Sequence, residues 1–250
     1  MIGIVDSGIG GLSAYLPLRE KCESDILYLA DEAHLPYGEK TDAELLSYAR
    51  AAIAFFEEKG ADAVLFACGT LSSAALPYIK RTPMPVYGAA EPAAKAAARQ
   101  TVCRRVAIAA TEATVRSGYL QKLLCAEGIA SVAIPCAPFV TLAENHTNAS
   151  EAYQTVQAWL APAADFGADT VLLGCTHYAF LKDSIRLALP SAMQIDAGKE
   201  AAKAFLKAQN PKKEQSKTVF YTTANPQSFA LQLGRILGDA PRHIEQVALK

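Results

Sequence analysis

The chain has 250 residues, of which 51% are hydrophobic and 20% are charged, and its formal net charge is −1. Acidic and basic residues are mixed along the sequence, so it lacks the basic patch that marks a nucleic-acid-binding protein. No apolar run reaches the roughly 18 residues that a membrane-spanning helix needs, and no positively charged leader precedes the first apolar stretch. We therefore expect a soluble, cytoplasmic protein with no nucleic-acid or membrane partner.

The predicted elements, in chain order, alternate between short runs rich in Val and Ile and stretches of helical periodicity. Between the second and third runs, for example, apolar residues from Leu45 to Phe56 fall on one face of a helix. This alternation is typical of α/β proteins whose parallel strands are buried on both faces, and such sheets bind ligands beyond the carboxyl ends of their strands. The predicted strands are Ile2–Val5, Ile26–Ala30, Ala63–Ala67, Val106–Ala110, Val132–Pro135 and Thr170–Leu173.

An internal repeat is the most informative feature of the sequence. The segment Gly-Ala-Asp-Ala-Val-Leu-Phe-Ala-Cys at residues 60–68 returns as Gly-Ala-Asp-Thr-Val-Leu-Leu-Gly-Cys at residues 167–175. Convergence is the alternative explanation, because Gly-Ala-Asp is ordinary turn chemistry before a strand. Two matches in the same order favour two pseudo-symmetric α/β halves. The second, fainter match pairs Ser7, Ser13, Tyr15 and Leu16 with Thr111, Ser117, Tyr119 and Leu120.

The two repeated cysteines, Cys68 and Cys175, each follow a predicted buried strand and precede a predicted helix. A thiol at a helix N-terminus lies near the positive end of the helix dipole and near unpaired N–H groups, both of which favour the thiolate. Thr70 and Thr176 offer hydroxyl and N–H groups at the same points, where a carboxylate would bind. The predicted helices are Leu71–Tyr78 and Phe180–Leu189.

If the two halves face each other across a cleft, the two thiols approach it from opposite sides. One thiol can then remove a proton from a stereocentre while the other returns a proton to the opposite face. Because acid and base exchange roles in the reverse reaction, they should be of the same residue type. For Cys68 and Cys175 the repeat and the adjoining threonines favour this role.

The remaining cysteines are scattered, and none forms a CxxC pair. A chain of this size needs no disulfides, so we expect reduced thiols that act as small buried hydrophobes. We also expect no metal site, since His177 alone among the histidines lies beside a cysteine and metal ligands usually come in short spacings. These cysteines are Cys22, Cys103, Cys125 and Cys136.

Ordered motifs extend along nearly the whole chain. They are Asp6-Ser7-Gly8-Ile9-Gly10-Gly11-Leu12-Ser13, Pro36-Tyr37-Gly38 with Lys40, Ala67-Cys68 with Thr70, Glu91-Pro92-Ala93, Ala110-Thr111 with Thr114, Pro138-Phe139-Val140 with Glu144, Gly174-Cys175-Thr176-His177-Tyr178, and Ile195-Asp196. In their joint order and spacing these motifs resemble the glutamate racemases of the aspartate/glutamate racemase superfamily.

The resemblance implies two interleaved, doubly wound α/β domains with mostly parallel sheets and an active site in the cleft between them. Residues 1–94 and 209–250 would form the first domain, and residues 95–208 the second. Glutamate would be the small-molecule substrate of a homodimer. No metal, pyridoxal phosphate or nucleotide cofactor is expected.

The implied activity is that of a cofactor-independent isomerase, which interconverts L- and D-glutamate by two-base proton transfer at Cα and supplies D-glutamate for peptidoglycan. Cys68 and Cys175 would transfer the protons. Asp6 would assist the first cysteine, and His177 with Glu144 would assist the second. The residues implied in substrate binding are Ser7, Pro36, Tyr37, Gly38, Gly69, Thr70, Thr111, Thr114 and Thr176.

One departure from the family pattern concerns the substrate. The family has Ala-Cys-Asn-Thr at the first cysteine, whereas this chain has Gly69 in the asparagine position. A lost polar contact with a charged group is worth roughly 1.5–3 kcal/mol, or about one to two orders of magnitude in affinity. The alternatives are therefore a weakly active paralogue or a racemase of another acidic amino acid. We expect Gly69→Asn to raise turnover or affinity for glutamate.

Other functions remain open from the sequence alone. Gly8-x-Gly10-x-x-Ser13 follows a strand, and Asp31 lies about 20 residues further on, as in an NAD-dependent oxidoreductase. That motif lacks its third glycine and leaves the repeated cysteines unexplained. A related enzyme that isomerises or decarboxylates small diacids, or a non-catalytic binding protein, would keep the same fold.

Overall fold

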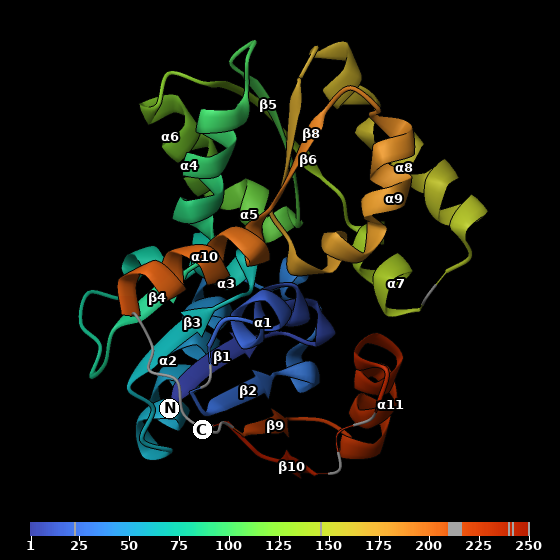
Figure 1. Cartoon of the computed structure of the whole chain (residues 1–250). Coiled ribbons are helices and arrows are strands. Elements are labelled where there is room, and N and C mark those ends of the chain that lie inside the picture. Colours follow the sequence, from blue (N-terminus) through green and yellow to red (C-terminus); the bar gives the residue numbers. More distant parts are fainter. Residues whose placement is uncertain (23, 146, 210–216, 240, 242, 250) are drawn as a thin grey trace.

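The computed structural model describes residues 1–22, 24–145, 147–209, 217–239, 241 and 243–249. Within these residues the chain forms two β-sheets, one above the other in Figure 1, and the strand pairs in both are parallel. The predicted α/β class with mostly parallel sheets is confirmed. The larger sheet has the order β10 (Ile244–Gln246), β9 (Thr218–Thr222), β2 (Ile26–Ala30), β1 (Ile2–Asp6), β3 (Ala63–Phe66), β4 (Val86–Gly88). The smaller sheet has the order β6 (Ala130–Pro135), β5 (Arg105–Ala110), β7 (Thr170–Leu173), β8 (Met193–Asp196).

The two sheets share one connectivity. The order β2-β1-β3-β4 in the larger sheet corresponds to β6-β5-β7-β8 in the smaller one. The repeated segments 60–68 and 167–175 supply β3 and β7, which occupy equivalent places. Gly60 and Gly167 both have left-handed backbone, with φ of 73° and 66°, which glycine adopts most readily. The repeat therefore corresponds to two pseudo-symmetric halves.

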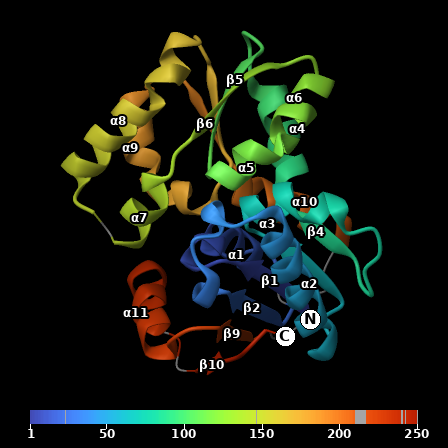
Figure 2. The same cartoon turned by 180° about the vertical axis from the view of Figure 1, so that it is seen from behind.

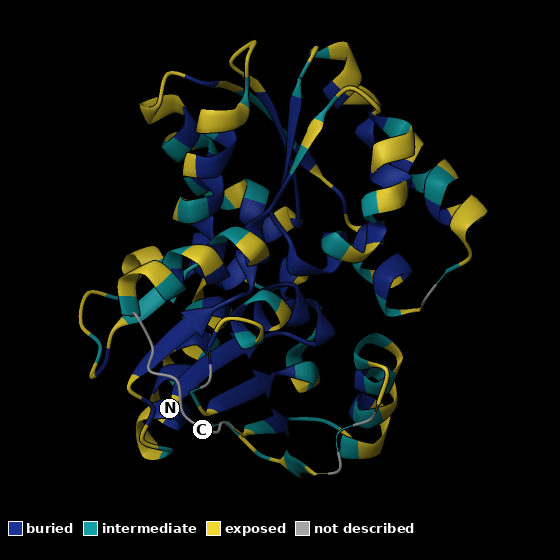
Figure 3. Ribbon diagram, viewed as in Figure 1, coloured by how far each residue is buried: buried dark blue, intermediate teal, exposed yellow. Residues whose placement is uncertain are grey.

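Helices cover the faces of both sheets (Figures 1 and 2), and the central strands are accordingly buried (Figure 3). One apolar cluster runs from Ile4 of β1 through Phe205 to Ile108 of β5, so the two halves share part of their core. The helices are α1 (Leu12–Arg19), α2 (Asp42–Glu58), α3 (Gly69–Ala74), α4 (Ala90–Gln100), α5 (Glu112–Ser117), α6 (Tyr119–Ala126), α7 (Pro138–Glu144), α8 (Ala149–Asp165), α9 (Lys182–Ala188), α10 (Ala197–Gln209) and α11 (Pro226–Leu237). Short 3₁₀ helices include η1 (Ile9–Gly11), η4 (Leu76–Tyr78) and η5 (Thr176–Leu181).

The predicted helices after the cysteines differ from those observed. Instead of one helix over Leu71–Tyr78, the chain forms the short α3 and then η4. Cys175 is followed by the 3₁₀ helix η5, and α9 begins only at Lys182. The segment after each cysteine is therefore shorter and tighter than an ordinary amphipathic helix, because it packs against the opposite half of the molecule.

The C-terminal part of the chain returns to the larger sheet. β9 pairs with β2, and β10 pairs with β9, so residues 218–222 and 244–246 extend the sheet that begins at Ile2. The division into residues 1–94 with 209–250 and residues 95–208 remains our proposal. Among the described residues, no helix combines the length and apolar character that crossing a membrane requires.

Candidate active site

A small cavity of about 130 Å³ lies between the two halves, where β1, β3, β5 and β7 end. Both repeated cysteines line this cavity, and they are 4% and 6% exposed. The carboxyl ends of parallel strands converge on one edge of a sheet, which explains why residues distant in sequence meet here. The other lining residues are Ser7, Leu35, Pro36, Tyr37, Gly38, Glu39, Thr70, Thr111, Glu112, Ala137, Val140, Thr141, Thr176 and His177.

Asp6 connects the two halves at the floor of the site. Its carboxylate accepts hydrogen bonds from the Gly8 amide at 3.2 Å and from the Thr176 hydroxyl at 3.0 Å. Complete burial raises the pKa of Asp6 to about 6, although the positive charge of His177 and the two hydrogen bonds act in the opposite direction. Asp6 can therefore exchange a proton close to neutral pH.

His177 lies between a cysteine and a carboxylate. Its Nδ1 is 3.9 Å from Sγ of Cys175, and its Nε2 is 2.6 Å from Oε1 of Glu144. Burial alone would lower the pKa of His177, but its interactions with Cys175 and Glu144 raise that pKa to about 10. The imidazole is therefore positively charged at neutral pH, and the charge faces Cys175.

Cys68 has a different environment. It is the N-cap residue of α3, and amides of Leu71 and Thr70 interact favourably with its thiolate form. Burial nevertheless raises the pKa of Cys68 well above its usual range, and the nearby charge of Asp6 adds to the increase. The amides at the start of this helix favour the thiolate, as we expect, but desolvation outweighs them.

Threonines from both halves form a buried hydroxyl cluster beside the cysteines. The Oγ1 atoms of Thr70 and Thr111 are 2.9 Å apart, and Oγ1 of Thr114 lies 2.9 Å from that of Thr111. Thr70 and Thr111 line the cavity, whereas Thr114 supports them from behind. These hydroxyls could reorient to donate hydrogen bonds to a carboxylate.

The predicted site residues occupy two shells. Asp6, Gly69, Thr114 and Glu144 are outside the set that lines the cavity, although Asp6, Thr114 and Glu144 are hydrogen-bonded to residues in it. The remaining predicted residues line it. Sequence reasoning missed six lining residues, and their closeness in sequence to Pro36, Thr111 and Pro138 was the available signal. They are Leu35, Glu39, Glu112, Ala137, Val140 and Thr141.

The glycine-rich loop after β1 contradicts the dinucleotide-binding alternative. A Cβ atom on Gly10 would lie 2.5 Å from the Thr176 hydroxyl and 2.6 Å from Nδ1 of His177, so the protein itself fills the space beside this loop. Asp31, the residue expected to bind a ribose, is fully buried and accepts hydrogen bonds from the Tyr37 and Thr223 hydroxyls. Neither group is free to hold a nucleotide.

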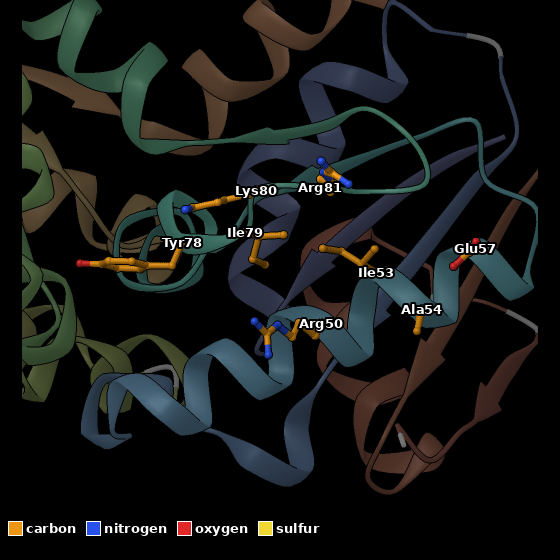
Figure 4. Close-up of a pocket in the computed structure, with 8 residues that line it drawn as sticks. All are labelled: Arg50, Ile53, Ala54, Glu57, Tyr78, Ile79, Lys80 and Arg81. Atoms are coloured by element: carbon orange, nitrogen blue, oxygen red, sulfur yellow. The ribbon is translucent and has the colours of Figure 1, made fainter.

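Other parts of the described surface offer fewer groups that could act in catalysis or bind a metal. The hollow in Figure 4, of about 590 Å³, lies between α2 and the segment after η4 and is lined by side chains such as Arg50, Tyr78 and Lys80. It contains no cysteine or histidine among its lining residues. Within the described part of the chain, no group of three or more His, Cys, Asp or Glu residues could hold a metal ion.

The sequence model of the Asp/Glu/Hydantoin racemase family matches residues 20–205. The chain belongs to this family. The glutamate racemase of Desulforudis audaxviator is 34% identical to it, over 99% of this chain and 97% of that protein. These matches confirm the predicted resemblance and the class of enzyme, an amino-acid racemase.

Solved structures agree with this membership. A glutamate racemase isoform from Bacillus anthracis superposes with a TM-score of 0.95 and 26% identity, over 100% of this chain and 97% of the other. Glutamate racemase from Francisella tularensis, in complex with D-glutamate, gives a TM-score of 0.91 with the same identity and coverage. The two-domain racemase fold is therefore shared along the whole chain.

Gly69, where the resemblance leads us to expect asparagine, lies at a close backbone contact. A Cβ atom at Gly69 would overlap the backbone carbonyl oxygen of Gly174 and lie 3.5 Å from the amide nitrogen of Cys175. The segments that carry the two cysteines thus pack backbone against backbone at this glycine. This geometry reverses our expectation for Gly69→Asn, because a side chain would push the segments apart rather than restore a missing contact.

Proposed function

We propose that this protein interconverts L- and D-glutamate without a cofactor, by proton transfer between Cα and two cysteines. One observation carries the proposal: the cysteines that end the two repeated segments line a single small cavity. The relatives support the choice of substrate, since those described above are named glutamate racemases and one of them was solved with D-glutamate.

Each proton transfer would use a different pair of groups. In one direction the Cys175 thiolate, paired with the His177 imidazolium, removes the α-proton. Cys68, kept as a thiol by burial, then gives its proton to the opposite face of the planar carbanion. The products are a Cys175 thiol, a Cys68 thiolate and the other enantiomer. In the reverse direction the roles exchange, as microscopic reversibility requires.

Asp6 would serve the Cys68 side of the reaction. Its carboxylate interacts electrostatically with Cys68, and its pKa of about 6 lies closer to neutrality than that of an ordinary aspartate. Asp6 can therefore take up the proton of Cys68 when that residue must act as the base. Glu144 would serve the other side by holding His177 in its charged form.

The substrate carboxylates would be bound mainly by hydroxyl and backbone N–H groups. Ser7, Thr70, Thr111 and Thr176 bring hydroxyls to the cavity from both halves. His177 contributes a positive charge at the same place. Binding a dicarboxylic amino acid would then hold the two halves together around the α-carbon.

The wider role follows from the resemblance to glutamate racemases. We propose a homodimer that acts in the cytoplasm and supplies D-glutamate for peptidoglycan. A second candidate, a racemase of another acidic amino acid, is favoured by one observation: Gly69 stands where the family has asparagine and packs directly against Gly174.

Circular dichroism of the purified protein with single enantiomers of glutamate and aspartate tests both candidates. We expect the signal of L-glutamate and of D-glutamate to decay to zero, with deuterium entering Cα when the reaction is run in heavy water. Faster decay for aspartate would favour the second candidate. Ligand binding with no decay and no deuterium incorporation would contradict catalysis altogether.

A further inference from the structure

Helix α11 brings a side chain from the C-terminal segment to the opposite half of the molecule. The strands that flank α11, β9 and β10, belong to the larger sheet, whereas α7 follows β6 of the smaller one. Figures 1 and 2 both show α11 directly below α7. Gln232 of α11 donates a hydrogen bond from Nε2 to Oε2 of Glu144, at 3.1 Å. This contact therefore crosses between the halves.

The same carboxylate leads to a reacting sulfur. Glu144 uses Oε2 for Gln232 and Oε1 for His177, and His177 in turn faces Cys175. Both carboxylate oxygens thus have a partner, which fixes the rotation of the carboxylate plane. The Glu144 side chain is 13% exposed, so it could turn towards solvent if one of these partners were lost.

The amide of Gln232 has capacity that this structure does not use. Its Oε1 is buried and has no hydrogen-bond partner. A primary amide can donate to a carboxylate or, after a 180° flip, accept from a carboxylic acid. Gln232 can therefore contact Glu144 either as a donor or as an acceptor, whereas a lysine could only donate.

We propose that Gln232 is a positioning residue that orients Glu144, and through it His177, for proton transfer at Cys175. This inference rests on the proposed racemase function. It assigns α11 a part in the chemistry although the helix contributes no residue to the cavity lining.

The charges around His177 determine how the loss of Gln232 would change the pKa of His177. His177 interacts with Cys175, Glu144 and Asp6, and burial opposes its positive charge. Glu144 interacts in turn with Asp6, Glu32 and Tyr28 besides His177. If Glu144 turns away, the burial of His177 is no longer offset, and its pKa falls from about 10 towards neutrality.

Gln232→Met is the sharpest variant, because methionine is unbranched and similar in size but has no donor or acceptor. We expect kcat/KM to fall about tenfold, as for the loss of one hydrogen bond to a charged group. The alkaline limb of the pH profile should move to lower pH. The substrate ammonium titrates in the same way with every variant. A difference between the pH profile of a variant and that of the parent protein therefore comes from the enzyme.

Gln227→Met is the matched control, since Gln227 lies on the same helix and is exposed. It should leave both the rate and the profile unchanged. Gln232→Glu offers a second test, because a carboxyl group can donate to Glu144 only when protonated. Its activity should therefore recover as the pH falls. An alkaline limb in Gln232→Met that coincides with that of Gln227→Met would overturn the proposal.

A measurement that needs no turnover separates this inference from the proposed function. The imidazole of His177 can be titrated by NMR, with its signal assigned from a His177→Asn sample. We expect its midpoint to fall in Gln232→Met and to stay in place in Gln227→Met. A protein that does not racemise glutamate but shows this shift would contradict the function alone. An unshifted midpoint would contradict the role of Gln232.

Discussion

Cys68 and Cys175 occupy equivalent places in the two halves, but their surroundings differ. Two residues beyond the cysteine, the first half has Thr70 and the second has His177. At the end of the neighbouring strand, the first half has Asp6 and the second has Ala110. The duplication thus provides two similar positions for sulfur. The residues that differ between the halves provide a buried carboxylate on one side and an imidazolium on the other.

Replacing either sulfur should have the largest effect and tests whether both sides are required. We expect Cys68→Ser and Cys175→Ser each to lower the rate of racemisation at least about a thousandfold. A base has to lose its own proton first, and a serine hydroxyl is far too weakly acidic to do so. Circular dichroism with either enantiomer of glutamate measures this loss. Cys125→Ser is the control, because Cys125, like Cys103, is exposed and not buried as we expect from the sequence. Full activity in either cavity variant would end the two-base mechanism.

A side chain at Gly69 should change the spacing between the segments that carry Cys68 and Cys175. We expect Gly69→Asn to lower kcat/KM about a hundredfold, because displacing reacting groups by about 1 Å has an effect of that order. Gly118→Asn is the control: nothing lies within 4 Å of a Cβ atom there, and asparagine tolerates its left-handed backbone. Higher activity in Gly69→Asn would show that the lost amide contact matters more than the backbone packing.

The two limbs of the pH profile of activity should report the two sides of the site, with the acid limb set by Asp6 and the alkaline limb by His177. Asp6 has to be ionised to accept a proton, so activity should fall as the pH drops below about 6. His177 has to be charged, so activity should fall as the pH rises past about 10. In profiles of kcat/KM, Asp6→Asn should lose the acid limb, and His177→Asn should keep only the alkaline limb that the substrate ammonium causes; each should lose about tenfold in rate. Limbs with the midpoints of the parent protein in both variants would contradict these assignments.

The last expected effect is on stability rather than on rate. The pKa of Asp6 is raised from 3.8 to about 6, so the folded protein holds this proton more tightly than the unfolded chain. Stability should therefore decrease as the pH rises from about 4 to about 6, by about 3 kcal/mol. Asp6→Asn escapes this loss, and its melting temperature should exceed that of the parent at pH 8 but not at pH 4. Equal differences at both pH values would argue against the shift.

The sequence predicted the central strands well because their apolar runs are buried on both faces whatever the details of packing. β2 and β7 have the predicted bounds, and β1 differs by one residue. The edge strands β4, β8 and β10 were missed. β4 and β10 have only three residues each, none of them buried, which are too few to produce a periodic pattern.

The candidate site was predictable where chemistry follows from local sequence, as for the repeated cysteines at strand ends. It was not predictable where the effect depends on tertiary packing. The proton affinity of Cys68 is governed by how deeply it is buried, which no neighbour in sequence reveals. The role of Gly69 depends on Gly174, more than a hundred residues away. Gln232 lies 88 residues from Glu144 and carries no local signal of its own.

The late return of the chain to the first sheet has a consequence for synthesis on the ribosome. Until residues 218–222 emerge, β2 is an open edge of the sheet that begins at Ile2, and an unpaired edge strand invites association with other chains. The same late segment brings α11. A nascent or truncated chain that ends before β9 would therefore be prone to aggregate. The same chain could not form the contact to Glu144, so a chain with an incomplete sheet would also lack a contact that the reaction uses.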